Sequence, residues 1–152
     1  MTNFRIYVDT SVFGGILDKE FAEVSKQFFK QIQEGKFILV SSAIVQQEID
    51  PAPLEIKKFF SEISGLAEII EITREAIELR ESYLKARIVS PAYSDDALHV
   101  ALATVSNCSM IVSWNFKHIV HYDKIALYNT INVSNGFNQI SIFSPMEVID
   151  YE

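Results

Sequence analysis

Short apolar segments of β-strand character alternate along this chain with longer segments of helical periodicity, and this alternation restricts the fold more than any other feature. Strands joined through helices usually run parallel, in a sheet whose two faces those helices cover. The sequence therefore predicts an α/β fold, a three-layer α/β/α sandwich with a mostly parallel central sheet. The expected strands are 4–8, 37–40, 66–72, 110–113 and 137–143, the expected helices are 21–33, 43–49, 54–63, 73–87 and 95–105, and 91–93 is an expected loop.

Glycine and serine residues mark several of the expected boundaries. Gly14 and Gly15 are expected to interrupt the chain after the first strand, and Gly35 to end the first long helix as a C-cap. Ser41 and Ser42 are expected to cap the short helix that follows the second strand. These punctuating residues separate the elements by short connections, which agrees with a compact fold.

Composition limits the size and class of the protein. The 152 residues suit a single domain covering 1–152, and 49% hydrophobic residues can form a core. The net charge of −7 argues against a protein that holds nucleic acid by bulk positive charge, but not against a nuclease whose metal ions offset local acidity. The single cysteine excludes an intrachain disulfide, and the absence of a signal-like or membrane-spanning apolar run predicts a cytoplasmic protein.

Acidic residues at the edge of the expected core are the candidates for chemistry. Hydrolysis of a phosphodiester needs a strong nucleophile and charge neutralisation, and Mg²⁺ or Mn²⁺, which prefer carboxylate oxygens, can supply both. Asp9 is the clearest candidate, because it follows an apolar strand directly where that strand leaves the core. A helix- or turn-capping role would explain Asp9 as well. Thr10 and Ser11 could bond water or phosphate oxygens beside it, or cap the next turn.

Further acids lie on two of the expected helices. Glu48 is on the helix 43–49, where a solvated helix face would account for it equally well. Asp95 and Asp96 open an apolar helix, a position that the helix dipole favours for any acid, but two adjacent acids there also suit the rim of a metal site. His99 lies one turn after Asp96, and packing with a hydrogen bond is the simpler reading of it.

An amide and two histidines follow the expected strand 110–113. Asn115 follows Ser113 and Trp114, and its amide could bind a phosphate oxygen without adding charge, or could form an asparagine turn. Trp114 is interpreted as a packing residue. His118 and His121 have a zinc-like separation, but no cysteine or HExxH pattern supports a zinc site.

The carboxyl ends of the strands offer one place where these side chains can meet. Open parallel sheets bind their ligands at that edge, and Asp9 and Asn115 both come at strand ends. We therefore expect Asp9, Glu48 and Asp96 to converge at one rim of the sheet, with Asn115 beside them.

Four segments, in chain order, resemble the four motifs of PIN domains. The first and third, a hydrophobic strand ending in Asp-Thr-Ser and an Asp followed by a helix of small residues, are the more specific. The segments are Tyr7-Val8-Asp9-Thr10-Ser11, Glu48 on its helix, Asp96-Ala97-Leu98-His99-Val100-Ala101-Leu102-Ala103, and Ile111-Val112-Ser113-Trp114-Asn115.

The resemblance implies a metal-dependent endoribonuclease that hydrolyses RNA with Mg²⁺ or Mn²⁺. It implies that Asp9, Glu48 and Asp96 are the metal ligands and that Asn115 completes the catalytic set. Many bacterial members are VapC-like toxins of type II toxin–antitoxin pairs, so it also implies an antitoxin partner, and the family often forms homodimers. Residues that would contact substrate or support the site are Thr10, Ser11, Asp95, His99, Ser113 and Lys117.

The sequence departs from the family pattern in two places. Asn115 stands where other members carry Asp, although many members also have Asn there, so metal binding would rest on three carboxylates. His118 stands where several toxins place another acid, which puts a second metal site in doubt. The segment after Asn115 carries no motif.

We weigh three other functions against the sequence. The first is a PIN-fold module that binds RNA or protein without cutting, which the intact acids Asp9, Glu48 and Asp96 argue against. The second is a phosphatase of the haloacid-dehalogenase type, which needs a second Asp where Ser11 stands. The third, a P-loop or dinucleotide-binding enzyme, is excluded because the five glycines form no phosphate-binding loop.

An acidic nuclease needs a local cationic surface to receive RNA. Lys85, Arg87 and Lys117 flank the segments of Asp96 and Asn115 and could form a basic lip there. Ordinary solubilising charges would look the same in the sequence.

Overall fold

The computed structural model describes residues 4–150 and has an α/β architecture around a five-stranded sheet. The strands are β1 (Phe4–Val8), β2 (Phe37–Ser42), β3 (Glu68–Ile70), β4 (Met110–Val112) and β5 (Ser141–Phe143). The α-helices are α1 (Thr10–Gly14), α2 (Ala22–Gln33), α3 (Ala43–Ile49), α4 (Leu54–Ile63), α5 (Arg74–Lys85), α6 (Ser94–Val105), α7 (Tyr122–Ser134) and α8 (Pro145–Val148). Short 3₁₀ turns are η1 (Gly15–Leu17), η2 (Ser64–Leu66) and η3 (Pro91–Tyr93).

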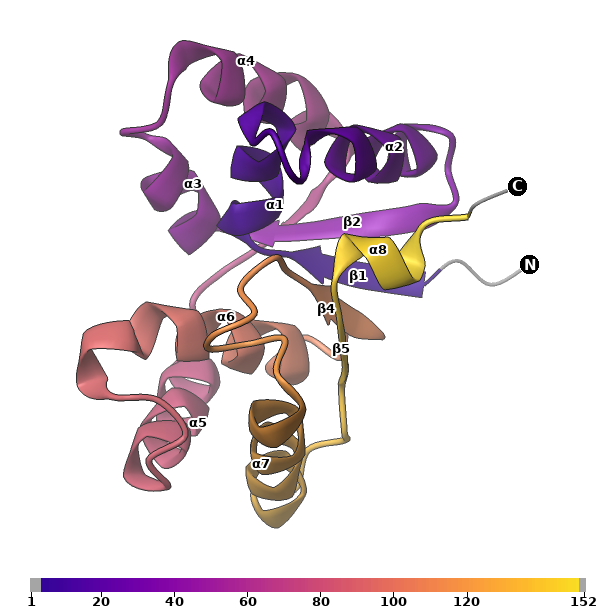
Figure 1. Ribbon diagram of the computed structural model, residues 1–152. Coiled ribbons are helices and arrows are strands. Elements are labelled where there is room, and N and C mark those ends of the chain that lie inside the picture. The colour runs from indigo at the N-terminus through magenta and orange to yellow at the C-terminus, as the bar shows by residue number, and fades with distance from the viewer. Residues whose placement is uncertain (1–3, 151–152) are drawn as a thin grey trace.

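The sheet has the order β3-β2-β1-β4-β5, and all four strand pairs are parallel. Helices α1 to α4 cover one face, and α5, α6 and α7 cover the other, so the chain forms three layers (Figure 1). The expected α/β/α sandwich is confirmed, and the sheet is parallel throughout. The central strand β1 is bracketed by β2 and β4, which places Asp9 in the middle of the carboxyl edge.

The core explains why the central strands are almost wholly apolar. Ile6, Tyr7 and Val8 are fully buried, as expected for a parallel strand covered on both faces. On the α1–α4 side, Phe13 packs against Phe29 and Phe60 with ring centroids 4.8 and 5.1 Å apart. This packing ties the segment that follows Asp9 to the helices above it.

Several expected boundaries need correction. The strand expected at 66–72 is limited to β3, because its start is taken up by η2, and the strand expected at 137–143 is limited to β5. The expected loop 91–93 is the turn η3. Ser42 is the N-cap residue of α3, but its hydroxyl makes no capping bond and contacts Tyr7 instead.

The prediction that Gly14 and Gly15 interrupt the chain was wrong. Both have right-handed helical backbone angles and continue from α1 into η1. A Cβ at Gly15 would lie 2.6 Å from Ser25 Oγ and 2.9 Å from Trp114 Nε1, so glycine is needed there for close approach. Helix α2 ends where expected, but its C-cap residue is Glu34, and Gly35, with φ of +85°, is the left-handed residue that follows it.

Helix α7 was missed by the sequence analysis. Its buried residues are Tyr128 and Asn132, and apolar residues such as Leu127 and Val133 stay exposed, so no single apolar stripe marks it.

None of the helices formed within residues 4–150 is long and apolar enough to cross a bilayer.

Candidate active site

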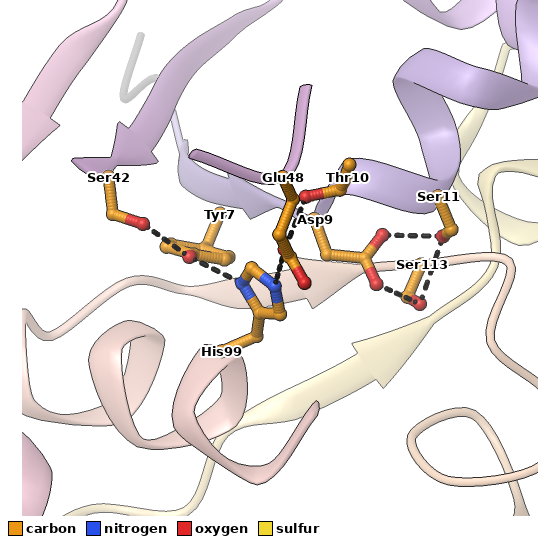
Figure 2. Close-up of polar contacts among 8 residues, drawn as sticks. All are labelled: Tyr7, Asp9, Thr10, Ser11, Ser42, Glu48, His99 and Ser113. Atoms are coloured by element: carbon orange, nitrogen blue, oxygen red, sulfur yellow. Dashed lines mark hydrogen bonds and ion pairs between the residues drawn. The ribbon is translucent and has the colours of Figure 1, made fainter. Parts of the chain in front are cut away.

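Asp9 leaves the end of β1 with its carboxylate held by two serine hydroxyls. Ser11 Oγ donates to Asp9 Oδ1 at 2.6 Å, and Ser113 Oγ donates to Asp9 Oδ2 at 2.7 Å (Figure 2). Asp9 is the N-cap residue of α1, yet its side chain makes no capping bond. The carboxylate is only 4% exposed. The Asp9 side chain therefore does not cap α1, and its carboxylate is held at the carboxyl edge of the sheet.

The two serines are fixed in turn by backbone groups of the segment after β4. The Trp114 N–H donates to Ser11 Oγ at 2.8 Å, and the Asn115 N–H donates to Ser113 Oγ at 2.9 Å. A rigid backbone thus holds the donors that orient Asp9, which is the arrangement that precise placement of a ligand or reactive group requires.

Glu48 lies beside Asp9 on α3, the helix that follows the neighbouring strand β2. Thr10 Oγ1 donates to Glu48 Oε1 at 2.6 Å, and His99 Nε2 lies 2.6 Å from the same oxygen (Figure 2). The side chain of Glu48 remains 32% exposed. The solvated helix face considered from the sequence is therefore not the whole account, since one carboxylate oxygen is turned into the molecule.

His99 is the buried residue at the centre of this polar group. It is 2% exposed, and its Nδ1 lies 2.7 Å from the Tyr7 hydroxyl, which itself lies 2.8 Å from Ser42 Oγ. When Nε2 donates to Glu48, Nδ1 of the neutral ring accepts a hydrogen bond from the Tyr7 hydroxyl. The chain Ser42–Tyr7–His99–Glu48 fixes the ring and connects two strands with α6 and α3 (Figure 2).

The electrostatics of the group reflect burial and mutual attraction. Burial raises the pKa of Asp9 above its ordinary value, against the lowering effects of His99 and the two serine bonds. Burial alone would raise the pKa of Glu48, but the bond and the charge of His99 lower it on balance. Burial alone would lower the pKa of His99, but Glu48 and Asp9 raise it. A protonated His99 would therefore face two carboxylates.

Asp96 and Asp95 lie in the first turn of α6. Asp96 is half-buried and makes no hydrogen bond to Asp9 or Glu48. Its negative charge acts to raise the pKa of His99 and of His118. Asp95 is exposed, and the N-cap residue of the helix is Tyr93. The structure thus places Asp9 and Glu48 side by side (Figure 2), with Asp96 one helical turn before His99, which is bonded to Glu48.

Asn115 lies at the same edge but uses its side chain in a turn. Its Oδ1 accepts the His118 N–H at 2.9 Å, which is the asparagine turn considered from the sequence. Trp114 is buried, stacks on Phe21 with centroids 4.1 Å apart and donates from Nε1 to Ser25. Its packing role, expected from the sequence, is confirmed.

The donor set has the chemistry of a site for a hard divalent ion, but not a closed shell of ligands. Within residues 4–150, no three Asp, Glu, His or Cys side chains are grouped closely enough to enclose a metal ion, and His118 and His121 belong to no such group. Asp9 and Glu48 offer carboxylate oxygens, and Mg²⁺ is commonly bound through one or two carboxylates with water completing its shell. Burial raises the pKa of the Asp9 carboxylate, and a bound cation would offset this cost of keeping it charged.

Comparison with known families decides the assignment of the chain. The sequence pattern of the PIN domain matches residues 6–125, which is well over half of the protein. The chain belongs to the PIN-domain family. The resemblance found in the four motifs is thereby confirmed, and they fall within the matched residues. PIN domains are generally nucleases and typically use divalent metal ions. Among proteins with curated descriptions, none matches this sequence significantly.

Solved structures support the same PIN fold. FitAcB from Neisseria gonorrhoeae has a TM-score of 0.61 at 16% identity, covering 94% of this chain and 99% of the other. VapBC2 from Rickettsia felis, bound to a promoter DNA fragment, has a TM-score of 0.59 at 11% identity, covering 92% and 98%. A toxin–antitoxin complex from Klebsiella pneumoniae has a TM-score of 0.56 at 16% identity, covering 74% and 88%. At such identities the likeness establishes the fold.

Two members of the polar group were not anticipated from the sequence of this PIN domain. Tyr7 lies on a strand where an apolar pattern predicts only packing, and Ser42 was expected only as a helix cap, yet the two form the far end of the chain that holds His99. No local signal distinguishes them, because their partner lies 92 residues from Tyr7 in the chain.

Proposed function

We propose that this PIN domain is a divalent-metal-dependent endoribonuclease that acts as the toxin of a toxin–antitoxin pair. One observation carries the proposal: a buried carboxylate, Asp9, stands at the carboxyl end of the central strand, oriented by Ser11 and Ser113, with Glu48 beside it. A fixed, poorly solvated carboxylate at that edge is suited to hold a hard cation.

In this proposal Asp9 and Glu48 hold Mg²⁺ or Mn²⁺, and Asp96, in the first turn of α6, is a further candidate ligand. The ion supplies Lewis-acid neutralisation of the phosphate and lowers the pKa of the attacking water. Ser11 and Ser113 hold the Asp9 carboxylate in one orientation, and His99 and Thr10 hold that of Glu48. These residues determine where the phosphodiester can be received.

The phosphatase alternative finds no support in the geometry. Ser11 occupies the place where that mechanism needs a second acid, and it is spent on the Asp9 carboxylate at 2.6 Å. This strand end therefore carries one acid, Asp9, where that mechanism uses two.

A PIN-fold binding module without cleavage is the second candidate. The observation in its favour is that no closed three-ligand group forms within residues 4–150. The two candidates differ in one measurable outcome, which is whether RNA is cut when Mg²⁺ or Mn²⁺ is present.

The deciding experiment incubates the full chain with mixed RNAs in Mg²⁺, Mn²⁺ or EDTA, beside Asp9→Asn and Asp50→Asn prepared identically. Asp50 is an exposed acid at the end of α3 and serves as the matched control. We expect metal-dependent internal cleavage by the wild type and by Asp50→Asn, and none by Asp9→Asn. Equal cleavage by all three would point to a contaminating nuclease and end the proposal.

An antitoxin partner is part of the proposal because the three compared structures include toxin–antitoxin complexes. The chain leaves large apolar side chains exposed, among them Leu54 and Leu66, which a partner could cover. Expression of the wild-type chain alone should arrest bacterial growth, and co-expression with the protein encoded by the adjacent open reading frame should restore it. Arrest by Asp9→Asn as well would contradict toxicity through RNA cleavage.

A further inference from the structure

A stacked pair of rings stands beside the candidate active site. The rings of Tyr93 and His118 have centroids 4.0 Å apart and planes inclined by 29°. The Lys117 ammonium lies 5.9 Å from the Tyr93 ring centroid. Tyr93 is 42% exposed, so the stack is not enclosed by the fold. An aromatic surface with a cation next to it is thus open to solvent.

The pair joins the two segments that carry Asp96 and Asn115. Tyr93 is the last residue of η3 and the N-cap residue of α6, three residues before Asp96. The backbone N–H of His118 donates to Asn115 Oδ1, and the carboxylate of Asp96 acts on His118 through its charge. The stack is therefore built into the rim where a phosphodiester would be cut.

The other aromatic stack at this edge has a different environment. Trp114 and Phe21 stack at 4.1 Å, but Trp114 is 6% exposed and its indole N–H is bound to Ser25. That pair is packing. An aromatic ring can serve as a platform for a nucleobase only when it is accessible, and Tyr93, at 42% exposed, is far more accessible than Trp114.

We propose that Tyr93 and His118 form a stacking subsite for an unpaired base of the RNA next to the scissile phosphodiester, with Lys117 contacting a neighbouring phosphate. The proposal rests on the proposed function and adds to it the residues that would receive a base. A base can lie on this stack only after it has left a duplex, so the subsite selects single-stranded segments or loops. It also offers an acidic protein a local cation and a stacking surface in place of bulk positive charge.

The test measures binding separately from cleavage. In an Asp9→Asn background, fluorescence anisotropy compares a labelled single-stranded RNA of mixed sequence with an abasic ribose–phosphate chain of equal length. We expect Tyr93→Leu to weaken binding of the RNA by on the order of tenfold, and to leave binding of the abasic chain unchanged. Tyr93→Phe should restore the affinity, because the ring face and not the hydroxyl makes the contact.

Phe4→Leu is the matched control, because Phe4 is an exposed aromatic residue, 53% accessible, at the opposite end of β1. His118→Leu is a second variant in case Tyr93→Leu disturbs the start of α6, which a melting curve would reveal. The subsite would be overturned if Tyr93→Leu and His118→Leu bound the RNA as tightly as the parent. It would also be overturned if these variants lost as much affinity for the abasic chain as for the RNA. Base-dependent binding without cleavage by the wild type would overturn the nuclease assignment and retain the subsite.

Discussion

The hydroxyl of Ser113 donates a 2.7 Å hydrogen bond to the carboxylate of Asp9 across the ends of two adjacent strands. The two residues are 104 positions apart in the chain, and the parallel pairing of β1 with β4 brings them together. The bond ties the orientation of the candidate metal ligand to the register of the sheet. Each of the following predictions concerns a contact of this kind.

Ser113→Ala should destabilise the protein by about 1–3 kcal/mol, because it removes a buried donor to a carboxylate and an acceptor for the Asn115 N–H. Urea denaturation measures the change. Ser134→Ala is the control, since the Ser134 hydroxyl is exposed and bonds only a carbonyl of its own helix. A similar loss of stability in both variants would mean that the Asp9 contact contributes nothing specific.

The ion pair of His99 and Glu48 should make stability depend on pH in the metal-free protein. The raised pKa of His99 gives a contribution that is complete below its ordinary value of 6.5 and is lost as pH rises through the folded value. The lowered pKa of Glu48 gives one that is complete above 4.5 and is lost as pH falls through its folded value. The stability difference between wild type and His99→Gln should therefore be largest between pH 4.5 and 6.5.

This difference is measured by thermal unfolding in EDTA at several pH values. Glu81→Gln is the control, because its salt bridge with Arg80 lies on the surface and His99 takes no part in it. A difference between wild type and His99→Gln that stayed constant from pH 4 to 9 would show that the pair is not charged in the folded protein.

The role of Asp96 can be read from metal-induced stabilisation. Mg²⁺ that binds the folded state should raise the melting temperature of the wild type, and Asp96→Asn should reduce this rise if Asp96 is a ligand. The metal-free Asp96→Asn protein should gain on the order of 1 kcal/mol by relief of repulsion. Asp95→Asn, the exposed neighbour, is the matched control. An equal rise in wild type and Asp96→Asn would exclude Asp96 as a ligand.

The two adjacent glycines should respond in opposite directions to alanine. Gly15→Ala should destabilise the protein by about 1–3 kcal/mol, because its Cβ would approach Ser25 and Trp114 too closely. Gly14→Ala meets nothing within 4 Å and should stabilise α1 by about 0.4–1 kcal/mol. Chemical denaturation of both variants checks this, and a stable Gly15→Ala protein would show that the Trp114 ring can move aside.

Lys117 and Arg87 remain the predicted cationic contacts for RNA. If Lys117 neutralises one phosphate, Lys117→Ala should weaken binding for all sequences and lower the slope of log affinity against log salt by about 0.7. Arg87→Ala should do the same if the end of α5 reaches the RNA. Lys58→Ala on α4, which covers the other face of the sheet, is the control. Unchanged slopes in both variants would place the basic lip elsewhere.

Sequence patterns sufficed wherever a local rule and the fold agreed. The apolar strand that ends at Asp9, the amphipathic helix closed by Gly35 and the alternation of elements predicted the parallel three-layer fold, since each depends on residues close in sequence. Helix α7 was not predicted, because only Tyr128 and Asn132 are buried in it, against α5 and α6, and they form no periodic apolar stripe.

By itself the sequence determined that acids stand at strand and helix ends, because the ends of apolar segments can be recognised from neighbouring residues alone. Only the tertiary structure decided which of them meet. Parallel pairing set Ser113 against Asp9, α3 and α6 carried Glu48 to His99, and Asp96 was left a turn away. The strand order and the packing of helices on the sheet fix these distances, and both arise from contacts between residues far apart in the chain, which no local pattern records.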